Sequence, residues 1–299
     1  MEKTDKIWMD GSFVDWDQAT IHVLSHTLHY GMGVFEGIRF YETESGPAVF
    51  RLEDHIQRMM KGAQTCMMQV PFTTHEIMNA VLETIKINKC GEGYIRPLFF
   101  YGYGSMSLNP QKSPVRCAIA VWPWGSYLGE QAVKVKISSF MRIHPASTHA
   151  DQKICGHYVN SIFASCEAQK KGFSEAVLLD HHGYISEGSG ENIFLIKDTV
   201  MYTPPCGNIL PGITRDSIIT LASDLGYTVK EVHLQMKDVH CADEAFFSGT
   251  AAEITPISQM DDTVLPTSCG KITARLQEEF QNIVRGKNPR YRHWLTPVL

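Results

Sequence analysis

Apolar residues recur at helical spacing in several segments of the chain, which is the pattern of a helix with one buried face. In the first half it covers Ile56, Met59, Met60, Ala63 and Met67, and less regularly residues 77–88. In the second half a helix that opens at Pro211-Gly212 buries Ile218, Leu221, Ala222 and Leu225, and the last helix presents Ile272, Leu276, Phe280, Ile283 and Val284. A further helix is predicted for residues 158–171.

Strand-like runs, rich in β-branched and aromatic residues, lie between these helices. Residues 6–10 and 12–16 flank Asp10-Gly11, which is a hairpin signal, and residues 34–41 and 48–52 flank Glu44-Ser45-Gly46. Further strands are predicted at 94–101, 115–122, 133–139, 176–179, 192–196, 228–232 and 244–248. Hairpins are too frequent for a doubly wound parallel sheet, so we predict two α+β domains.

A change in composition divides the chain. Turn residues and aromatics mix from Trp122 to Gly129, which is typical of an interdomain segment. We therefore predict an N-terminal domain at residues 1–123, a connecting segment at 124–134 and a C-terminal domain at 135–299. Internal repeats and low-complexity tracts are absent from the sequence.

Composition excludes several classes of function. The 27 Lys and Arg against 32 Asp and Glu give no basic surface for nucleic acid or a membrane, and no apolar stretch approaches the ~20 residues of a spanning helix. The first residues lack the apolar core of a signal peptide, so we expect a cytoplasmic protein with eight reduced cysteines. Without a Cys-x-x-Cys pair, and with His22, His26 and His29 lacking a His-Glu-x-x-His pattern, no metal site is predicted.

Three short segments of the second half carry possible binding groups. Residues 186–192 place two carboxylates among glycines directly before an apolar strand, which fits either a solvated turn or a carboxylate held close to a ligand. Residues 210–215 open a helix whose first N–H groups can bind phosphate, and residues 248–253 form a second small-residue turn with exposed amides. Together they suit one phosphate and one carboxylate, as in an amino acid bound to a phosphorylated cofactor.

Five motifs in order carry a family resemblance. They are Tyr30-Gly31-Met32-Gly33-Val34-Phe35-Glu36-Gly37-Ile38-Arg39, Tyr94-Ile95-Arg96-Pro97-Leu98, Glu187-Gly188-Ser189-Gly190-Glu191-Asn192, Leu210-Pro211-Gly212-Ile213-Thr214-Arg215 and Ser248-Gly249-Thr250-Ala251-Ala252-Glu253-Ile254-Thr255-Pro256. They resemble the class IV aminotransferases, and within them the branched-chain aminotransferases, over nearly the whole chain. The resemblance implies a fold-type-IV architecture, with a smaller N-terminal and a larger C-terminal α/β domain and pyridoxal 5'-phosphate between them.

The resemblance also implies roles for single residues. Lys153 would be the catalytic residue, holding the cofactor as a Schiff base and moving a proton. Tyr158 would hydrogen-bond the phenolic oxygen of the cofactor, and Glu187 would pair with its pyridine nitrogen and keep that nitrogen protonated. The remaining cofactor contacts, mostly to the phosphate, would come from Arg58, Leu210, Gly212, Ile213, Thr214 and Thr250.

The implied substrates are L-leucine, L-isoleucine or L-valine, with glutamate and the matching 2-oxo acids, so one pocket must accept both an aliphatic and a charged side chain. The implied substrate-binding residues are Tyr30, Phe35, Gly37, Arg39, Tyr94, Arg96, Leu108, Trp124, Tyr127, Thr250, Ala251 and Ala252, with Tyr158 beside them in the apolar wall. Arg96 would meet the glutamate γ-carboxylate, and Thr250 and Ala251 the α-carboxylate. Tyr30 and Leu108 would reach in from a neighbouring subunit, which implies a homodimer or higher homo-oligomer.

Other members of the same fold family remain alternatives. D-amino-acid and (R)-amine transaminases share the scaffold, and an aminodeoxychorismate lyase would share Lys153 and Glu187 but would not transfer nitrogen to a keto acid. A scaffold that only binds the cofactor would not need Lys153. The sequence departs from the family pattern between Lys153 and Tyr158, because Ile154-Cys155-Gly156-His157 stands where the family usually has two glycines and an asparagine before the tyrosine, although Lys153 and Tyr158 stay in register.

Overall fold

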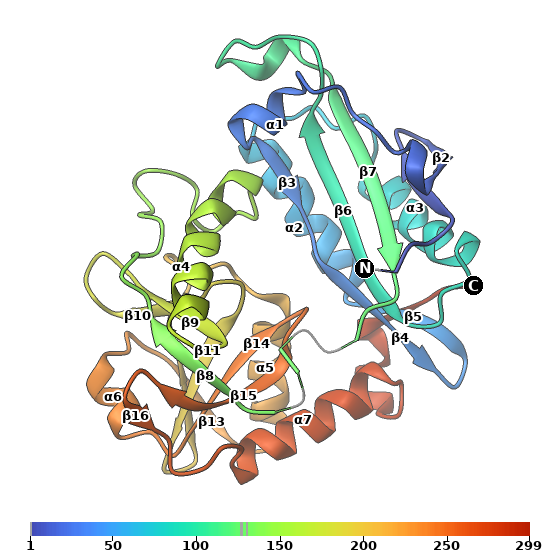
Figure 1. Ribbon diagram of the computed structural model, residues 1–299. Helices are drawn as coiled ribbons and strands as arrows, with labels where there is room; N and C mark the ends of the chain where they lie inside the picture. The colour runs from blue at the N-terminus through green and yellow to red at the C-terminus, as the bar shows by residue number, and fades with distance from the viewer. Residues whose placement is uncertain (1, 126–127, 130) are drawn as a thin grey trace. The chain divides into compact units, whose positions relative to one another are not determined.

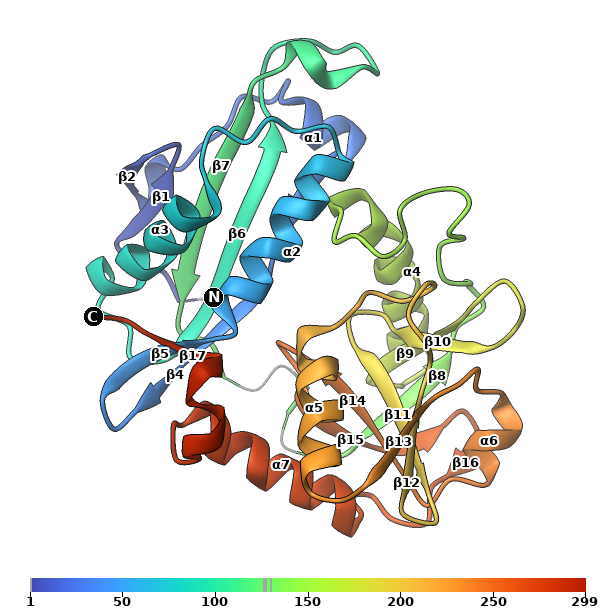
Figure 2. The same cartoon turned by 180° about the vertical axis from the view of Figure 1, so that it is seen from behind.

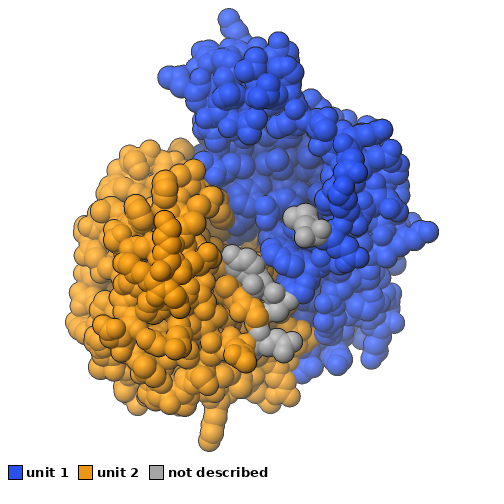
Figure 3. All heavy atoms as spheres, in the orientation of Figure 1, with its two compact units in different colours: residues 1–125, 152–156, 282–299 blue, residues 126–151, 157–281 orange. Residues whose placement is uncertain are grey.

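The computed structural model describes residues 2–125, 128–129 and 131–299. These residues form two compact units, coloured separately in Figure 3. Unit 1 contains residues 1–125, 152–156 and 282–299, and unit 2 contains residues 126–151 and 157–281. Each unit combines helices with a sheet, so the predicted α+β class is confirmed. The chain thus enters unit 1 three times, and the second entry is the five-residue segment that carries Lys153.

Unit 1 is built on an eight-stranded sheet with the order β17-β5-β4-β6-β7-β1-β2, and β3 pairs with β6 beside this path. All of its strand pairs are antiparallel. The strands are β1 (Lys6–Met9), β2 (Ser12–Asp15), β3 (Gly33–Phe35), β4 (Ile38–Thr43), β5 (Gly46–Phe50), β6 (Gly93–Tyr101), β7 (Val115–Trp122) and β17 (Leu295–Pro297). Both predicted hairpins are confirmed, as β1–β2 and β4–β5.

Two helices, α2 (Leu52–Thr65) and α3 (Thr74–Ile87), cover one face of this sheet, and Figure 2 shows both in front of it. The apolar positions predicted to be periodic are the ones that they bury, including Ile56, Met59 and Ile77. Leu52, which we expected to end a strand, instead begins α2, because Arg51 adopts a left-handed backbone (φ 50°) that stops the strand there. Shorter helices are α1 (His26–Tyr30) and the 3-10 turns Trp16–Gln18, Pro110–Lys112 and Pro289–Trp294.

Unit 2 is built on a nine-stranded mixed sheet with the order β10-β9-β8-β15-β14-β11-β12-β13, with β16 beside β15. Its strands are β8 (Val133–Ile137), β9 (Glu175–Leu179), β10 (Ile185–Gly188), β11 (Asn192–Lys197), β12 (Val200–Thr203), β13 (Thr228–Glu231), β14 (Glu244–Gly249), β15 (Glu253–Met260) and β16 (Thr263–Val264). Its helices are α4 (Tyr158–Lys170), preceded by the 3-10 turn Cys155–His157, then α5 (Ile213–Asp224), α6 (Met236–His240) and α7 (Lys271–Val284), whose last three residues belong to unit 1. Figure 1 shows α4 beside β8 and β9.

The sequence pattern missed the central strand β15. Pro256 argues against a strand because it cannot donate to the ladder, yet it lies within β15 as the partner of Phe246. The strand is secured by antiparallel pairing with β14 on one side and parallel pairing with β8 on the other. The predicted helix at 158–171 and the strands at 192–196 and 244–248 agree with α4, β11 and β14.

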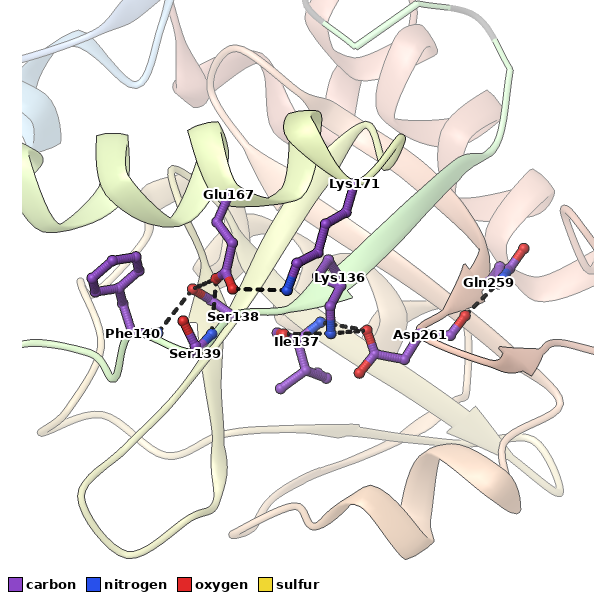
Figure 4. Close-up of polar contacts among 9 residues, drawn as sticks. All are labelled: Lys136, Ile137, Ser138, Ser139, Phe140, Glu167, Lys171, Gln259 and Asp261. Carbon is purple, nitrogen blue, oxygen red and sulfur yellow. Dashed lines mark hydrogen bonds and ion pairs between the residues drawn. The ribbon is translucent and has the colours of Figure 1, made fainter.

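A polar network fastens α4 to the end of β8 (Figure 4). Glu167 on α4 accepts hydrogen bonds from the Ser138 hydroxyl and the Ser139 amide, both at 2.8 Å, and Lys171 lies 3.2 Å away. These donors hold the pKa of the Glu167 carboxyl at about 2, and the Ser139 amide contributes most. Nearby, Asp261 accepts from Lys136 at 2.7 Å and from the Ile137 amide at 3.0 Å. Because Tyr158 is the first residue of α4, this network also positions a predicted site residue.

We predict that Glu167→Gln lowers the free energy of unfolding by about 1–3 kcal/mol at pH 7, the range for losing hydrogen bonds to a charged acceptor. The folded-state pKa lies below the ordinary value of 4.5, so the contribution is present above pH 4.5 and is lost as the pH falls towards 2. Thermal unfolding should therefore separate the variant from the wild type near neutrality and bring them together in acid. Glu278→Gln, which removes an exposed ion pair with Arg275, is the control and should change little. A difference in melting temperature between the variant and the wild type that does not change with pH would contradict the role of the ionised Glu167 carboxylate.

Candidate active site

The segment that carries Lys153 is bound to β3 within unit 1. The Phe35 amide donates to the Lys153 carbonyl at 3.2 Å, the Gly156 amide donates to the Gly31 carbonyl at 2.9 Å, and Val34 and Ile154 form an antiparallel bridge. A Cβ on Gly31 would lie 2.7 Å from the Gly156 Cα, and Gly31 has φ +70°. Position 31 therefore requires glycine on both counts, which explains part of the first sequence motif.

Phe35 lies under two cationic side chains. The Lys153 Nζ is 5.0 Å from the centre of its ring, and the Arg96 guanidinium is 4.8 Å from the same centre. Both distances suit attraction between a cation and the face of an aromatic ring. Phe35 as a residue is only 9% exposed, so its ring forms a buried apolar surface beside the lysine. The structure thus brings together three residues that the sequence assigned separately to lysine chemistry and substrate binding.

Tyr94 and Gly37 fit each other closely. A Cβ on Gly37 would lie only 1.8 Å from the Tyr94 hydroxyl oxygen, so a larger residue at position 37 would displace that hydroxyl. The Tyr94 ring packs edge-on against Trp124, with ring centres 4.3 Å apart, and Arg96 reaches the Tyr94 hydroxyl at 3.5 Å. The Arg96 Nε is buried and has no hydrogen-bond partner among the described residues. The rings of Tyr94 and Trp124 and the guanidinium of Arg96 therefore lie side by side, and the Arg96 Nε can donate to an anion.

The other assigned residues of unit 1 lie in two places. Arg39, the cross-strand neighbour of Tyr94, donates to the Gly125 carbonyl at 2.6 Å and is 5% exposed. Tyr30 and Leu108 are 45% and 81% exposed, and the Tyr30 hydroxyl donates to the Met106 carbonyl at 3.1 Å. Tyr30 lies in the segment 21–30 and Leu108 in the segment 103–108. The other exposed apolar residues of these two segments are Ile21, Val23, Leu24, Leu28, Tyr103 and Met106. Tyr127, also assigned to substrate binding, lies outside the described residues.

Arg58 is held by a buried carboxylate that the sequence analysis did not assign. Its Nε and Nη2 donate to the two oxygens of Glu36, at 2.7 and 2.8 Å, and the His55 Nδ1 is 2.8 Å from the same carboxylate. Glu36 and His55 are almost fully buried. Burial alone would raise the pKa of Glu36, but Arg58 and His55 together hold it well below its usual range. The pKa of His55 is lowered, chiefly by burial and partly by Arg58 and Lys153.

In unit 2, Glu187 lies on β10 and is 6% exposed. The Arg142 Nε donates to one of its oxygens, while the Leu210 amide at 3.1 Å and the Asn192 side chain at 3.3 Å donate to the other. Arg142 also donates to the Ala150 carbonyl at 3.0 Å, which fixes the guanidinium. Glu187 is therefore an oriented carboxylate, and the solvated turn that the sequence left open does not describe it. Arg142 and Asn192 are the positioning residues that the sequence analysis did not assign.

Asn192 also fixes the loop before α5. Its side-chain amide donates to the Leu210 carbonyl at 3.0 Å, and a Cβ on Gly212 would lie 1.9 Å from its Oδ1. Gly212 is the N-cap of α5, without a capping side chain, and Ile213 and Thr214 form the first turn. The first N–H groups of a helix have no partner within the helix and carry a partial positive charge. This terminus is therefore suited to an anion, and the phosphate role of these residues stays a prediction.

The remaining assigned residues lie on the β14–β15 connection and on α4. Gly249 pairs with Glu253, so Thr250, Ala251 and Ala252 form the connecting turn, and the Ala252 carbonyl accepts from the Thr255 hydroxyl at 2.8 Å. Tyr158 begins α4 after His157, whose Nε2 lies 2.8 Å from the Thr148 hydroxyl.

Among the described residues, no cluster of three or more His, Cys, Asp or Glu side chains is arranged to hold a metal ion. None of the helices in that part of the chain is both long and apolar enough to cross a membrane.

Comparison with known proteins identifies the family. Residues 33–260 match the family described as Amino-transferase class IV. The branched-chain-amino-acid aminotransferase of Pseudomonas aeruginosa is 45% identical over 98% of this chain and 97% of its own, and that of Escherichia coli is 42% identical over 99% and 98%. The crystal structure of the branched-chain aminotransferase from Thermoproteus uzoniensis with norvaline has TM-score 0.96 and 42% identity, over 99% of this chain and 100% of that one. The chain therefore belongs to the class IV aminotransferase family.

Proposed function

We propose that this chain is a pyridoxal-phosphate-dependent branched-chain-amino-acid aminotransferase, which moves the α-amino group of leucine, isoleucine or valine to 2-oxoglutarate and back. The observation that carries the proposal is the Lys153 side chain held over the Phe35 ring by backbone bonds to β3. It places an amine, the group that forms Schiff bases, beside an apolar surface. The full-length similarity to branched-chain aminotransferases supports the same activity.

The side chains fit the cofactor. Its aldehyde needs an amine, its pyridine nitrogen needs a carboxylate, and its phosphate needs cationic or N–H donors; Lys153, Glu187, Arg58 and the α5 N-terminus supply these. Glu187 is oriented by three donors, as a partner for a ring nitrogen must be. Solved structures of a similar branched-chain amino acid aminotransferase contain pyridoxamine 5'-phosphate and N-(5'-phosphopyridoxyl)-L-glutamate, which joins cofactor and substrate in one molecule. When bound, pyridoxal phosphate accepts the amino group and withdraws electrons from the substrate Cα.

Each residue then has a defined task. Lys153 would hold the cofactor covalently through its Nζ, and once the substrate amine displaces it, the freed Nζ amine would move a proton from the substrate Cα to the cofactor carbon. Glu187 keeps a proton on the pyridine nitrogen, and Tyr158 donates a hydrogen bond to the phenolic oxygen. Arg58, Ile213, Thr214 and Thr250 hold the phosphate, with Leu210 and Gly212 shaping the loop.

The substrate side chain meets an apolar wall with one cation at its edge. Phe35 and Trp124 of unit 1 supply buried aromatic surface, and we assign the small apolar side chain of Ala252 in unit 2 to substrate binding as well. Arg96 offers the buried Nε to the γ-carboxylate of glutamate, and a planar guanidinium binds a carboxylate through two parallel hydrogen bonds. The amides of Thr250 and Ala251 bind the α-carboxylate shared by all the substrates. This division explains how one site serves two kinds of side chain.

The exposed apolar residues around α1 support a homo-oligomer. Residues 21–30 and the 103–108 loop are joined by a Ser25–Tyr103 bridge and by ring contact between His22 and Tyr103. Many exposed apolar side chains in two joined segments are typical of an interface, so we infer that a second copy covers Tyr30 and Leu108. The eight cysteines are free, which suits a reducing compartment, and we place the enzyme in the cytoplasm.

Lys153→Ala should remove both the yellow colour of the conjugated Schiff base and transamination of leucine with 2-oxoglutarate. Absorption spectra and coupled assays measure the two properties. Lys61→Ala, an exposed lysine on α2, is the matched control and should retain both. D-alanine and an (R)-amine, assayed in parallel, test the related transaminase activities. Near-normal turnover in Lys153→Ala would refute its role, and turnover of D-alanine but not of leucine would refute the substrate assignment.

Glu187→Gln keeps the size of the side chain but removes its charge. We expect the turnover number for leucine to fall by about a hundredfold or more, at ~1.4 kcal/mol for each tenfold change. Steady-state kinetics of the purified variant measure this loss. Glu278→Gln removes an exposed carboxylate from the same unit and should leave turnover unchanged. Wild-type kinetics in Glu187→Gln would contradict pairing with the ring nitrogen.

Arg96→Met should weaken single-turnover reaction with glutamate far more than with leucine, because only glutamate carries a second carboxylate. The loss for glutamate should be a few kcal/mol, as for removing the partner of a largely desolvated charge. Arg116→Met is the control, since Arg116 lies on the adjacent strand β7 and pairs with Asp10. If Arg96 only braces β6, both amino acids should lose rate equally and the melting temperature should fall. That result would end the dual-recognition proposal.

A further inference from the structure

Glu36 occupies a position where a charge is difficult to keep. Its side chain has no exposed surface, and an isolated carboxylate in such a place would be strongly destabilising. Four donors compensate for this cost: Arg58 Nε, Arg58 Nη2, His55 Nδ1 and, at 3.3 Å, the Gly37 amide. Apolar side chains of similar volume would often be equally stable, so stability alone gives a weak reason for such a pair.

The bonds to Glu36 determine how the Arg58 guanidinium is oriented. Two N–H groups on one edge of a planar guanidinium point at the two oxygens of one carboxylate, which fixes both the plane and its rotation. The opposite edge, with Nη1, therefore faces away from Glu36. The Arg58 side chain is 13% exposed whereas Glu36 is fully buried, so the arginine reaches closer to the surface than its partner.

His55 completes the arrangement from the same helix. Residues 55 and 58 lie three apart on α2 and share one face. An ionised carboxylate only accepts hydrogen bonds, so the His55 Nδ1 must carry a hydrogen, and its lowered pKa favours the neutral ring. The three side chains together then carry no net charge. Arg58 is thus held in one direction by Glu36, and its charge is balanced within the network.

We propose that Glu36, supported by His55, is a positioning residue that orients Arg58 to receive the phosphate of the cofactor. The inference rests on the proposed function, because it needs a phosphorylated ligand at Arg58. Glu36 itself touches neither cofactor nor substrate. It lies between Phe35 and Gly37, so the turn that presents the aromatic surface also holds the arginine.

The test compares two ligands that differ only in the phosphate. Pyridoxamine 5'-phosphate and pyridoxamine are titrated against the full-length chain, because neither forms a covalent bond to Lys153. Glu36→Gln should weaken pyridoxamine 5'-phosphate by about tenfold or more, the effect of losing one well-oriented charged contact, and leave pyridoxamine nearly unchanged. Glu92→Gln removes another carboxylate paired with an arginine, Arg285, in the same unit, and should alter neither.

A double-mutant cycle separates orientation from general bracing. If Glu36 acts through Arg58, then Arg58→Met and the double variant Glu36→Gln/Arg58→Met should bind pyridoxamine 5'-phosphate equally. This comparison also decides the matter if Glu36→Gln alone fails to fold, since the double variant leaves no unpaired buried arginine. Equal weakening of both ligands by Glu36→Gln, no weakening at all, or unequal binding by the last two variants would overturn the proposal. A wild-type chain that binds neither ligand would instead overturn the proposed function.

Discussion

The attachment of residues 152–156 to β3 is the constraint on which the proposed chemistry depends. More than a hundred residues separate the two segments, yet two backbone hydrogen bonds and one bridge make Lys153 part of the antiparallel unit. Closing so long a loop costs little more than closing one half its length, because the entropy of closure grows only with the logarithm of loop length. The lysine thus takes its place from a strand of the sheet, which is more rigid than a surface loop would be.

Glu36 and Glu187, two of the buried carboxylates, are each paired with an arginine but have different surroundings. Glu36 accepts hydrogen bonds from Arg58, His55 and a backbone amide, and its proposed task is to orient the arginine. Glu187 is also paired with an arginine, but it belongs to a surface formed with Asn192 and the loop before α5. Each unit therefore contains an arginine–glutamate pair in which one member has the proposed chemical role. In unit 1 that member is the arginine, and in unit 2 it is the glutamate.

Local patterns in the sequence predicted most of the elements, because a buried helix face and a hairpin turn leave a short-range signature. The periodic residues of α2 and the Asp10-Gly11 turn are examples. β15 was missed since Pro256 contradicts the local rule, and only its neighbours on both sides stabilise it. The sequence analysis predicted two domains joined by a single connecting segment, and those ranges stay a prediction. In the structure, unit 1 is built from three separate stretches of the chain. The candidate site shows the same limit: family motifs indicated Lys153 and Glu187, but not the partners that orient Glu187 or hold Arg58. Arg142 is 45 residues from Glu187, and Glu36 is 22 residues from Arg58, so no periodicity joins them.

The contact between Gly31 and Gly156 has a consequence for the evolution of new specificities. A Cβ at position 31 would collide with the Gly156 Cα, whereas a Cβ at position 156 would meet its nearest atom, the Gly31 carbonyl oxygen, at 3.4 Å, which is ordinary contact. The steric restriction therefore falls on one side of the contact only. The side chain at position 156 can therefore vary without disturbing how the lysine is held, while position 31 cannot. Combinatorial libraries for altered substrate range can vary position 156 and must leave position 31 alone.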